Sequence, residues 1–251
     1  MRQAEFDGKG SCIRWTETAG AEPARVYVHG LGSMSAVYHA HIAARAELAG
    51  RRSLFLDLPG HGISDRPEHF GYSLAEHADA VACALDAAGV TGAELIAHSM
   101  GGSVAVVLAH RRPDLVSRLV LTEANLDAFP PPTAGSSGIA SFDEEEFVDG
   151  GHARVLENVG AVWAATMRLA DPRGLYRTAV GLRRGSEPVM RTILEGLAID
   201  RVFLQGELSG PLEGEKALRE AGVRVVTVPG AGHNVMFDNP DAFVAAVAGQ
   251  L

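Results

Sequence analysis

Short apolar runs alternate with longer segments of helical periodicity through the first half of the chain. Four runs have the length and composition of buried strands: residues 26–28, 53–58, 93–97 and 119–122. The segments between them predict helices: residues 36–49, 74–88 and 101–110. Ser73, followed three positions later by Glu76, predicts a capping box at the start of the second helix. Strands separated by helices of this length indicate crossover connections and a mostly parallel sheet.

The same alternation returns near the end of the chain. Residues 201–205 and 223–228 predict two more core strands, with helices at about 212–221 and 235–248. The stretch from 125 to 199 differs, because it opens on a proline run and an acidic patch before several helical segments. We interpret residues 125–199 as a helical cap inserted over the carboxyl ends of the strands, where open α/β sheets bind ligands. Residues 1–124 and 200–251 then form one α/β core with a twisted sheet flanked by helices.

Composition narrows the class of protein. A chain of 251 residues with 47% hydrophobic and 21% charged residues is long enough for one well-packed domain and excludes wholesale disorder. The formal net charge of −9 argues against nucleic acid or an anionic membrane as the partner. The first ten residues include four charged ones, and no stretch approaches the ~18 apolar residues of a membrane span. We expect a cytoplasmic protein that acts on a small molecule.

The strand at 93–97 runs directly into Ser99, which is followed by Met100 and two glycines. This strand–turn–helix context with small flanking residues is typical of a nucleophile elbow, in which a serine is exposed on a strained turn. Ala97 stands where glycine is commoner, and adds one methyl group. A serine capping an ordinary helix is the alternative for this segment alone.

Two further segments supply what a serine nucleophile needs, namely donors for an oxyanion and a base. A glycine-containing loop follows the first strand, and the amide of Leu31 in it could face the oxyanion together with the amide of Met100. We expect His29 to hold the shape of that loop. His233 follows the last strand on a glycine-rich loop, and the order serine, acid, histidine along the chain is that of an α/β triad.

Together these segments resemble the α/β-hydrolase superfamily over nearly the whole chain. The matching motifs are HGLG at 29–32, DLPGHGISD at 57–65, the elbow at Ser99, and Gly232-His233. The resemblance implies hydrolysis of an ester-like bond without cofactor or metal, and a structural role for the 57–65 turn. Serine at the elbow favours acyl transfer over the dehalogenases and epoxide hydrolases of this fold, which attack with aspartate.

The acid of the triad departs from the family's pattern. In most relatives the acid is an aspartate that lies three residues after a glycine. Gly206 resembles that glycine, and the residue three positions after it in this chain is Ser209. Glu123, at the end of the strand 119–122, is our first candidate, since some haloalkane dehalogenases carry their acid after that strand. Glu207 is the alternative. The alternative for Glu123 and for Glu207 is an ordinary surface carboxylate without a catalytic role.

We therefore predict a serine hydrolase of a carboxylic ester, thioester or amide that works through an acyl-enzyme. Four residues of the cap are candidate substrate contacts and equally good core residues: Phe129, Trp163, Met167 and Leu169. The rival hypothesis is a ligand-binding protein on a hydrolase fold with little or no turnover, and Ser209 in the acid position keeps it open.

Overall fold

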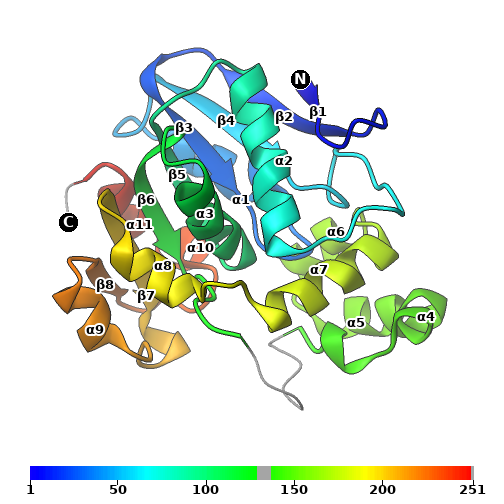
Figure 1. Cartoon of the computed structure of the whole chain (residues 1–251). Helices are drawn as coiled ribbons and strands as arrows, with labels where there is room; N and C mark the ends of the chain where they lie inside the picture. Colours follow the sequence, from blue (N-terminus) through cyan, green and yellow to red (C-terminus); the bar gives the residue numbers. More distant parts are fainter. Residues whose placement is uncertain (129–136, 250–251) are drawn as a thin grey trace.

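A computed structural model describes residues 1–128 and 137–249 (Figure 1). Its centre is an eight-stranded sheet in the order β1-β2-β4-β3-β5-β6-β7-β8. The strands are β1 (Arg2–Glu5), β2 (Cys12–Thr18), β3 (Ala21–Val28), β4 (Arg51–Asp57), β5 (Ala93–His98), β6 (Val116–Thr122), β7 (Asp200–Gly206) and β8 (Arg224–Val228). The six predicted strands are confirmed as β3 to β8, and all neighbours among them are parallel.

The two strands that sequence reasoning missed lie at the N-terminus. β1 pairs with β2 and β2 pairs with β4, both antiparallel, so the sheet is mixed at this edge. Their burial alternates only partly and their residues are largely polar, which hides them among the surface segments. The prediction of a mostly parallel sheet holds for the remainder.

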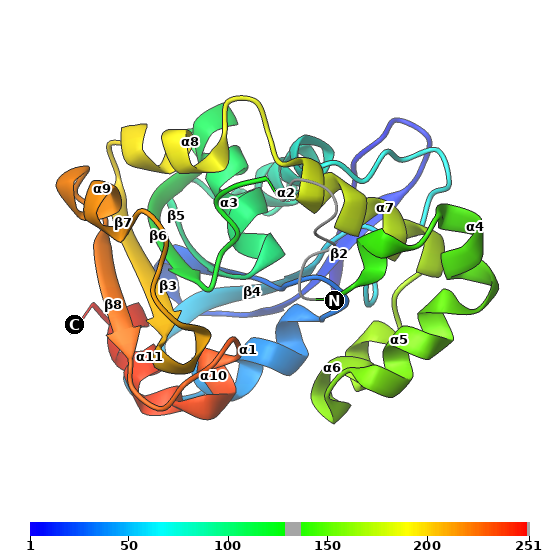
Figure 2. The same cartoon turned by 90° about the horizontal axis from the view of Figure 1, so that it is seen from below.

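Both faces of the sheet are buried, and alternate residues of each strand point to opposite faces. In β5, Leu95 and Ala97 join an apolar cluster with helices α2 (Leu74–Ala87) and α3 (Met100–Arg111). Ile96 joins a second cluster on the other face, with α1 (Ser35–Ala43), α10 (Val235–Asp238) and α11 (Pro240–Val247). Figure 2 shows these two helical layers above and below the sheet. Burial on both faces explains why the core strands are continuous apolar runs.

The remaining helices of the core are short. They are α1 (Ser35–Ala43), α9 (Glu215–Glu220), α10 (Val235–Asp238), α11 (Pro240–Val247) and the 3₁₀ turn η3 (Glu207–Ser209). The predicted capping box is present in α2, where Ser73 Oγ accepts from the Glu76 amide and Glu76 accepts from the Ser73 amide. No helix among the described residues is long and apolar enough to cross a membrane.

Two predicted helix boundaries were wrong. The single helix expected at 235–248 is two helices, because Pro240 has no amide hydrogen and cannot continue a helix. Asn239 instead caps the second one, its side chain accepting from the Ala242 amide at 3.1 Å. The first helix ends at Ala43 and not at residue 49, and turns lead from there into β4.

A helical insertion separates β6 from β7, as predicted. It contains η1 (Ile139–Ser141), α4 (Glu144–Glu146), the π-type turn η2 (Phe147–Gly151), α5 (His152–Asn158), α6 (Ala161–Met167), α7 (Pro172–Arg184) and α8 (Met190–Gly196). Figure 1 shows α4 to α7 gathered at one end of the sheet, whereas α8 lies back along the core. Ile193 and Leu194 of α8 belong to the same apolar cluster as α3.

Candidate active site

Ser99 occupies a strained turn between β5 and α3. Its φ of 52° and ψ of −124° lie outside the regions that non-glycine residues favour. The turn is held by a hydrogen bond from the Ser99 amide to the Thr122 carbonyl, 2.9 Å, at the end of the neighbouring strand. Close packing demands glycine after it, since a Cβ on Gly101 would lie 2.3 Å from the His29 carbonyl oxygen. The backbone is thus that of the predicted elbow, and the Ala97 methyl is accommodated in the core.

His233 reaches the same region from the loop between β8 and α10. Its Nδ1 lies 3.4 Å from Oε2 of Glu123, and its side chain is 45% exposed. Its own carbonyl accepts a hydrogen bond from Nε2 of His98 at 2.9 Å. His233 and Ser99 line the same cleft.

Glu123 is the carboxylate that the fold brings to His233. It follows β6 directly, has a φ of 51°, and its side chain is only 8% exposed. Its amide donates to the Leu204 carbonyl at 3.0 Å, and its Oε1 accepts from the Gly206 amide at 2.6 Å. Both bonds tie it to β7, so one oxygen is fixed at the end of that strand and the other faces the imidazole.

Glu207, the alternative acid, is placed differently. Its side chain is exposed, and its Oε2 accepts from the Gly230 amide at 2.9 Å. Within the described residues it makes no hydrogen bond or ion pair with His233. Ser209, in the position usual for the acid, is exposed at the end of η3. The geometry therefore brings together Ser99, His233 and Glu123, and leaves Glu207 outside.

The amides of Leu31 and Met100 are the expected oxyanion donors. Within the described residues neither has a hydrogen-bond acceptor. The Gly30 carbonyl accepts from Nδ1 of His29 at 2.7 Å and from the Ser33 amide at 3.1 Å. Because a trans peptide points its carbonyl and its amide hydrogen in opposite directions, these bonds turn the Leu31 N–H away from His29. Met100 is the first residue of α3, where the helix dipole also favours negative charge.

His29 holds the loop, as predicted. It is fully buried, its Nε2 accepts from the Leu58 amide at 3.0 Å, and burial lowers its pKa to about 4. It thereby joins the HGLG loop to the 57–65 turn. In that turn Asp57 is buried as well and accepts from the amides of Ser35 and Ile63. These contacts are structural and lie away from the imidazole of His233.

The cleft is open to solvent on one side, and about 650 Å³ of space, part of it bulk solvent, lies between its walls. Core loops form one wall with Leu31, Ser99 and His233, and the insertion forms the other. Trp163 lines it, and its indole N–H donates to the Leu31 carbonyl at 2.7 Å, which links α6 to the HGLG loop.

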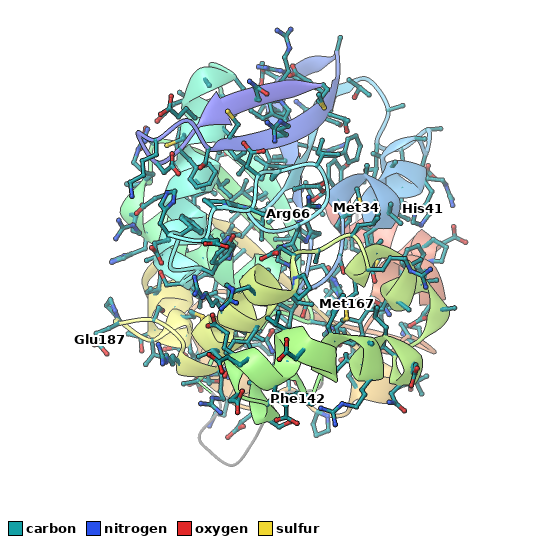
Figure 3. All side chains as sticks on the ribbon, turned by 90° about the vertical axis from the view of Figure 1, so that its right-hand side faces the viewer. Met34, His41, Arg66, Phe142, Met167 and Glu187 are labelled. Atoms are coloured by element: carbon teal, nitrogen blue, oxygen red, sulfur yellow. The ribbon has the colours of Figure 1, made fainter. Side chains whose placement is uncertain are left out.

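The other candidate contacts lie elsewhere. Met167 is fully buried and packs against Gly32 at the junction of insertion and core (Figure 3), outside the lining of the cleft. Leu169 is 48% exposed and does not line the cleft either. Core packing and solvent exposure thus account for these two side chains. Phe129 lies outside the described residues.

Sequence reasoning missed several groups that line the cleft: Tyr38, His98, Asn125 and Arg183. His98 had a visible signal, because it immediately precedes Ser99 on the elbow. Asn125 lies just after β6, where its carbonyl accepts from Ser103 of α3. Arg183 had no signal, since it reaches the cleft from α7, whose position depends on the packing of the insertion.

Residues 24–159, more than half of the chain, match the family model described as alpha/beta hydrolase fold. The 2-(acetamidomethylene)succinate hydrolase of Mesorhizobium japonicum is 28% identical over 250 residues, covering 91% of this chain and 87% of the relative.

Two solved structures share the fold over almost their whole length. An esterase from Exiguobacterium antarcticum superposes with a TM-score of 0.82 at 20% identity, covering 98% of this chain and 97% of that one. The enol-lactonase from Burkholderia xenovorans gives a TM-score of 0.81 at 20% identity, covering 99% of both chains. At such identities the likeness concerns the fold. The match of more than half of the chain to the family model shows that this chain belongs to the α/β-hydrolase fold family.

Proposed function

We propose that this protein is a serine hydrolase that cleaves a carboxylic ester of a small molecule through an acyl-enzyme. The observation that carries the proposal is the approach of His233 Nδ1 to Glu123 Oε2, 3.4 Å, on the rim of a cleft that Ser99 also lines. A distance at the long end of the hydrogen-bond range is common in unliganded sites and shortens when substrate binds. The esterase and enol-lactonase structures described above are in keeping with this activity.

In the first half-reaction His233 Nε2 takes the proton of Ser99 Oγ as this oxygen attacks the carbonyl carbon of the ester. The charge that develops on the carbonyl oxygen is stabilised by the N–H groups of Leu31 and Met100. The tetrahedral intermediate then collapses, the bond to the alcohol oxygen breaks, and the departing alcohol takes the proton from His233. A thioester or an amide would follow the same steps with a thiol or amine as leaving group.

In the second half-reaction water replaces the alcohol. His233 takes a proton from the water as its oxygen attacks the acyl-enzyme, and returns it to Ser99 Oγ as the carboxylic acid leaves. Glu123 stays ionised throughout, orients the imidazole through Nδ1–H and stabilises the imidazolium. The other oxygen of Glu123, Oε1, accepts from the Gly206 amide and holds the carboxylate in this position.

The position of Glu123 argues against the rival hypothesis of a binding protein with little or no turnover. That hypothesis depended on Ser209 in the acid position, and the geometry provides a carboxylate beside His233 from the neighbouring strand. We further propose that residues 125–199 act as the cap of this site, with Trp163 as the substrate contact among the four candidates.

A fluorophosphonate probe tests the proposal directly. We expect the folded wild-type protein to be labelled on Ser99, with Ser99→Ala and heat-unfolded protein as unlabelled controls. Peptide mapping by mass spectrometry identifies the modified residue. If Ser99 stays unmodified in folded protein that gives a native unfolding transition, the protein is not a serine hydrolase.

A further inference from the structure

One charged side chain enters the cleft from the insertion. Arg183, in the last turn of α7, is half-buried and lines the cleft together with Trp163, Ala179 and Leu182, none of which carries a charge. On the core side the titratable groups of the lining are Tyr38, His98 and His233. Among the lining residues that the structure describes, the guanidinium is therefore the one permanent charge, in a largely apolar wall.

Arg183 has no carboxylate partner within the described residues. Its Nη1 donates to the Ala140 carbonyl at 3.2 Å, and this is its one hydrogen bond in the described part of the chain. Arg173 and Arg177 pair with Glu144, and Arg191 pairs with Asp127. Arg168 and Arg184 are also without an ion pair among the described residues, but both are exposed and neither lines the cleft. The residues outside the described part, 129–136 and 250–251, contain no aspartate or glutamate side chain.

A guanidinium presents five N–H donors in a planar fork that matches a carboxylate. One donor of Arg183 is used to hold the side chain against η1, which leaves the others for a group in the cleft. A charge in apolar surroundings is costly unless it is paired, and a bond between opposite charges is strengthened there.

We infer that the cleft binds esters that also carry a free, ionised carboxylate, and that Arg183 binds this carboxylate. The inference rests on the proposed function, since the ester itself must lie against Ser99. Arg183 acts as a specificity-determining residue and takes no part in bond breaking. A neutral ester of the same shape leaves the guanidinium unpaired, so the site discriminates against it.

Two pairs of esters that differ only in carboxylate against methyl test this inference. Monomethyl glutarate with methyl valerate places the charge on the acyl side, and 4-acetoxybutyrate with butyl acetate places it on the alcohol side. In at least one pair we expect kcat/KM, measured by pH-stat, to favour the anion by roughly tenfold to a hundredfold, the range for one hydrogen bond between charged groups.

Substitution assigns the preference to its residue. Arg183→Gln should bring the anion-to-neutral ratio of kcat/KM close to one, and Arg183→Lys, which keeps the charge without the fork, should retain part of it. Arg184→Gln is the matched control, because Arg184 is exposed, lies next in the chain and does not line the cleft. Its ratio should stay that of the wild type. Wild-type ratios at or below one in both pairs, or a ratio that survives in Arg183→Gln, would overturn the inference.

Binding separates this inference from the proposed function. The same four compounds are titrated calorimetrically into folded Ser99→Ala protein, which cannot turn them over. Tighter binding of an anion than of its neutral partner, lost in the Ser99→Ala, Arg183→Gln double variant, supports the carboxylate site even if hydrolysis and fluorophosphonate labelling both fail. Equal binding of the anion and its neutral partner in both pairs contradicts the carboxylate site. The proposed serine hydrolase is then still supported if the fluorophosphonate labels Ser99 of the wild type.

Discussion

At the scale of single residues, Glu123 is the decisive group. Its left-handed backbone, φ 51°, turns the chain at the end of β6 so that its side chain crosses towards β7. Glutamate has one methylene more than aspartate, and that length lets one oxygen bind the Gly206 amide while the other approaches His233. On our proposal, Glu123 takes the place of the shorter aspartate that most relatives carry after the strand equivalent to β7.

Glu123→Gln should lower kcat/KM for an activated ester by about 10² to 10⁴-fold, because a neutral amide neither fixes the tautomer nor stabilises the imidazolium. Assay with a p-nitrophenyl ester gives the number, and a thermal unfolding curve checks that the variant is folded. Glu207→Gln is the control, and its activity should stay near that of the wild type. Loss of activity in Glu207→Gln with retention in Glu123→Gln would show that the acid is Glu207.

At the scale of elements, the end of β5 is tied to the loop between β8 and α10. His98 is 3% exposed, and its Nε2–H donates to the His233 carbonyl. Its Nδ1 has no partner among the described residues, and burial holds the pKa of His98 well below its usual range. The ring is therefore a neutral donor that anchors the loop carrying His233, and we expect it to act as a positioning residue.

His98→Gln and His98→Leu test that anchor. Leucine removes the donor, so kcat/KM should fall by about tenfold, the worth of one hydrogen bond. Glutamine carries an amide nitrogen at the position of Nε2 and should restore most of the activity, which a role in packing alone would not explain. Equal loss in both variants, at equal thermal stability, would rule out the positioning role.

At the scale of the whole molecule, buried histidines make stability depend on pH. Five are nearly inaccessible: His29, His39, His61, His77 and His98. Burial lowers the pKa of each, to about 4 for His29 and about 3 for His39 and His61. In the unfolded chain they titrate near 6.5. Their contribution is thus complete above about pH 6.5 and is lost as the pH falls, since the unfolded chain then binds more protons.

We expect the free energy of unfolding to drop steeply between pH 6.5 and 5, by about 1.4 kcal/mol per pH unit for each buried histidine. Asp57 opposes this with one proton, because burial raises its pKa to about 6 and the folded state protonates first. Urea titrations at several pH values measure the slope. His39→Leu should reduce this slope by the contribution of one proton. His110→Gln, a change at an exposed position, should leave the slope unchanged. A flat profile would contradict the prediction.

Local patterns were sufficient for most of the fold. Six of the eight strands, the capping box of α2, the elbow at Ser99 and the helical insertion all follow from apolar periodicity and short motifs, which express interactions between residues close in sequence. Pro240 also marks locally the break between α10 and α11. β1 and β2 were not visible, because their residues are largely polar and because β2 joins the sheet by pairing with β4, which lies far along the chain.

By itself, the sequence determined the core of this protein, its turn at Ser99 and the set of residues from which a site could be built. Only the tertiary structure decided which carboxylate approaches His233, that Met167 and Leu169 lie outside the cleft, and that Arg183 enters it. Those outcomes depend on the register of β6 against β7 and on how α6 and α7 pack over the sheet. Such packing joins residues far apart in the chain, and no local pattern of hydrophobic and polar positions encodes it.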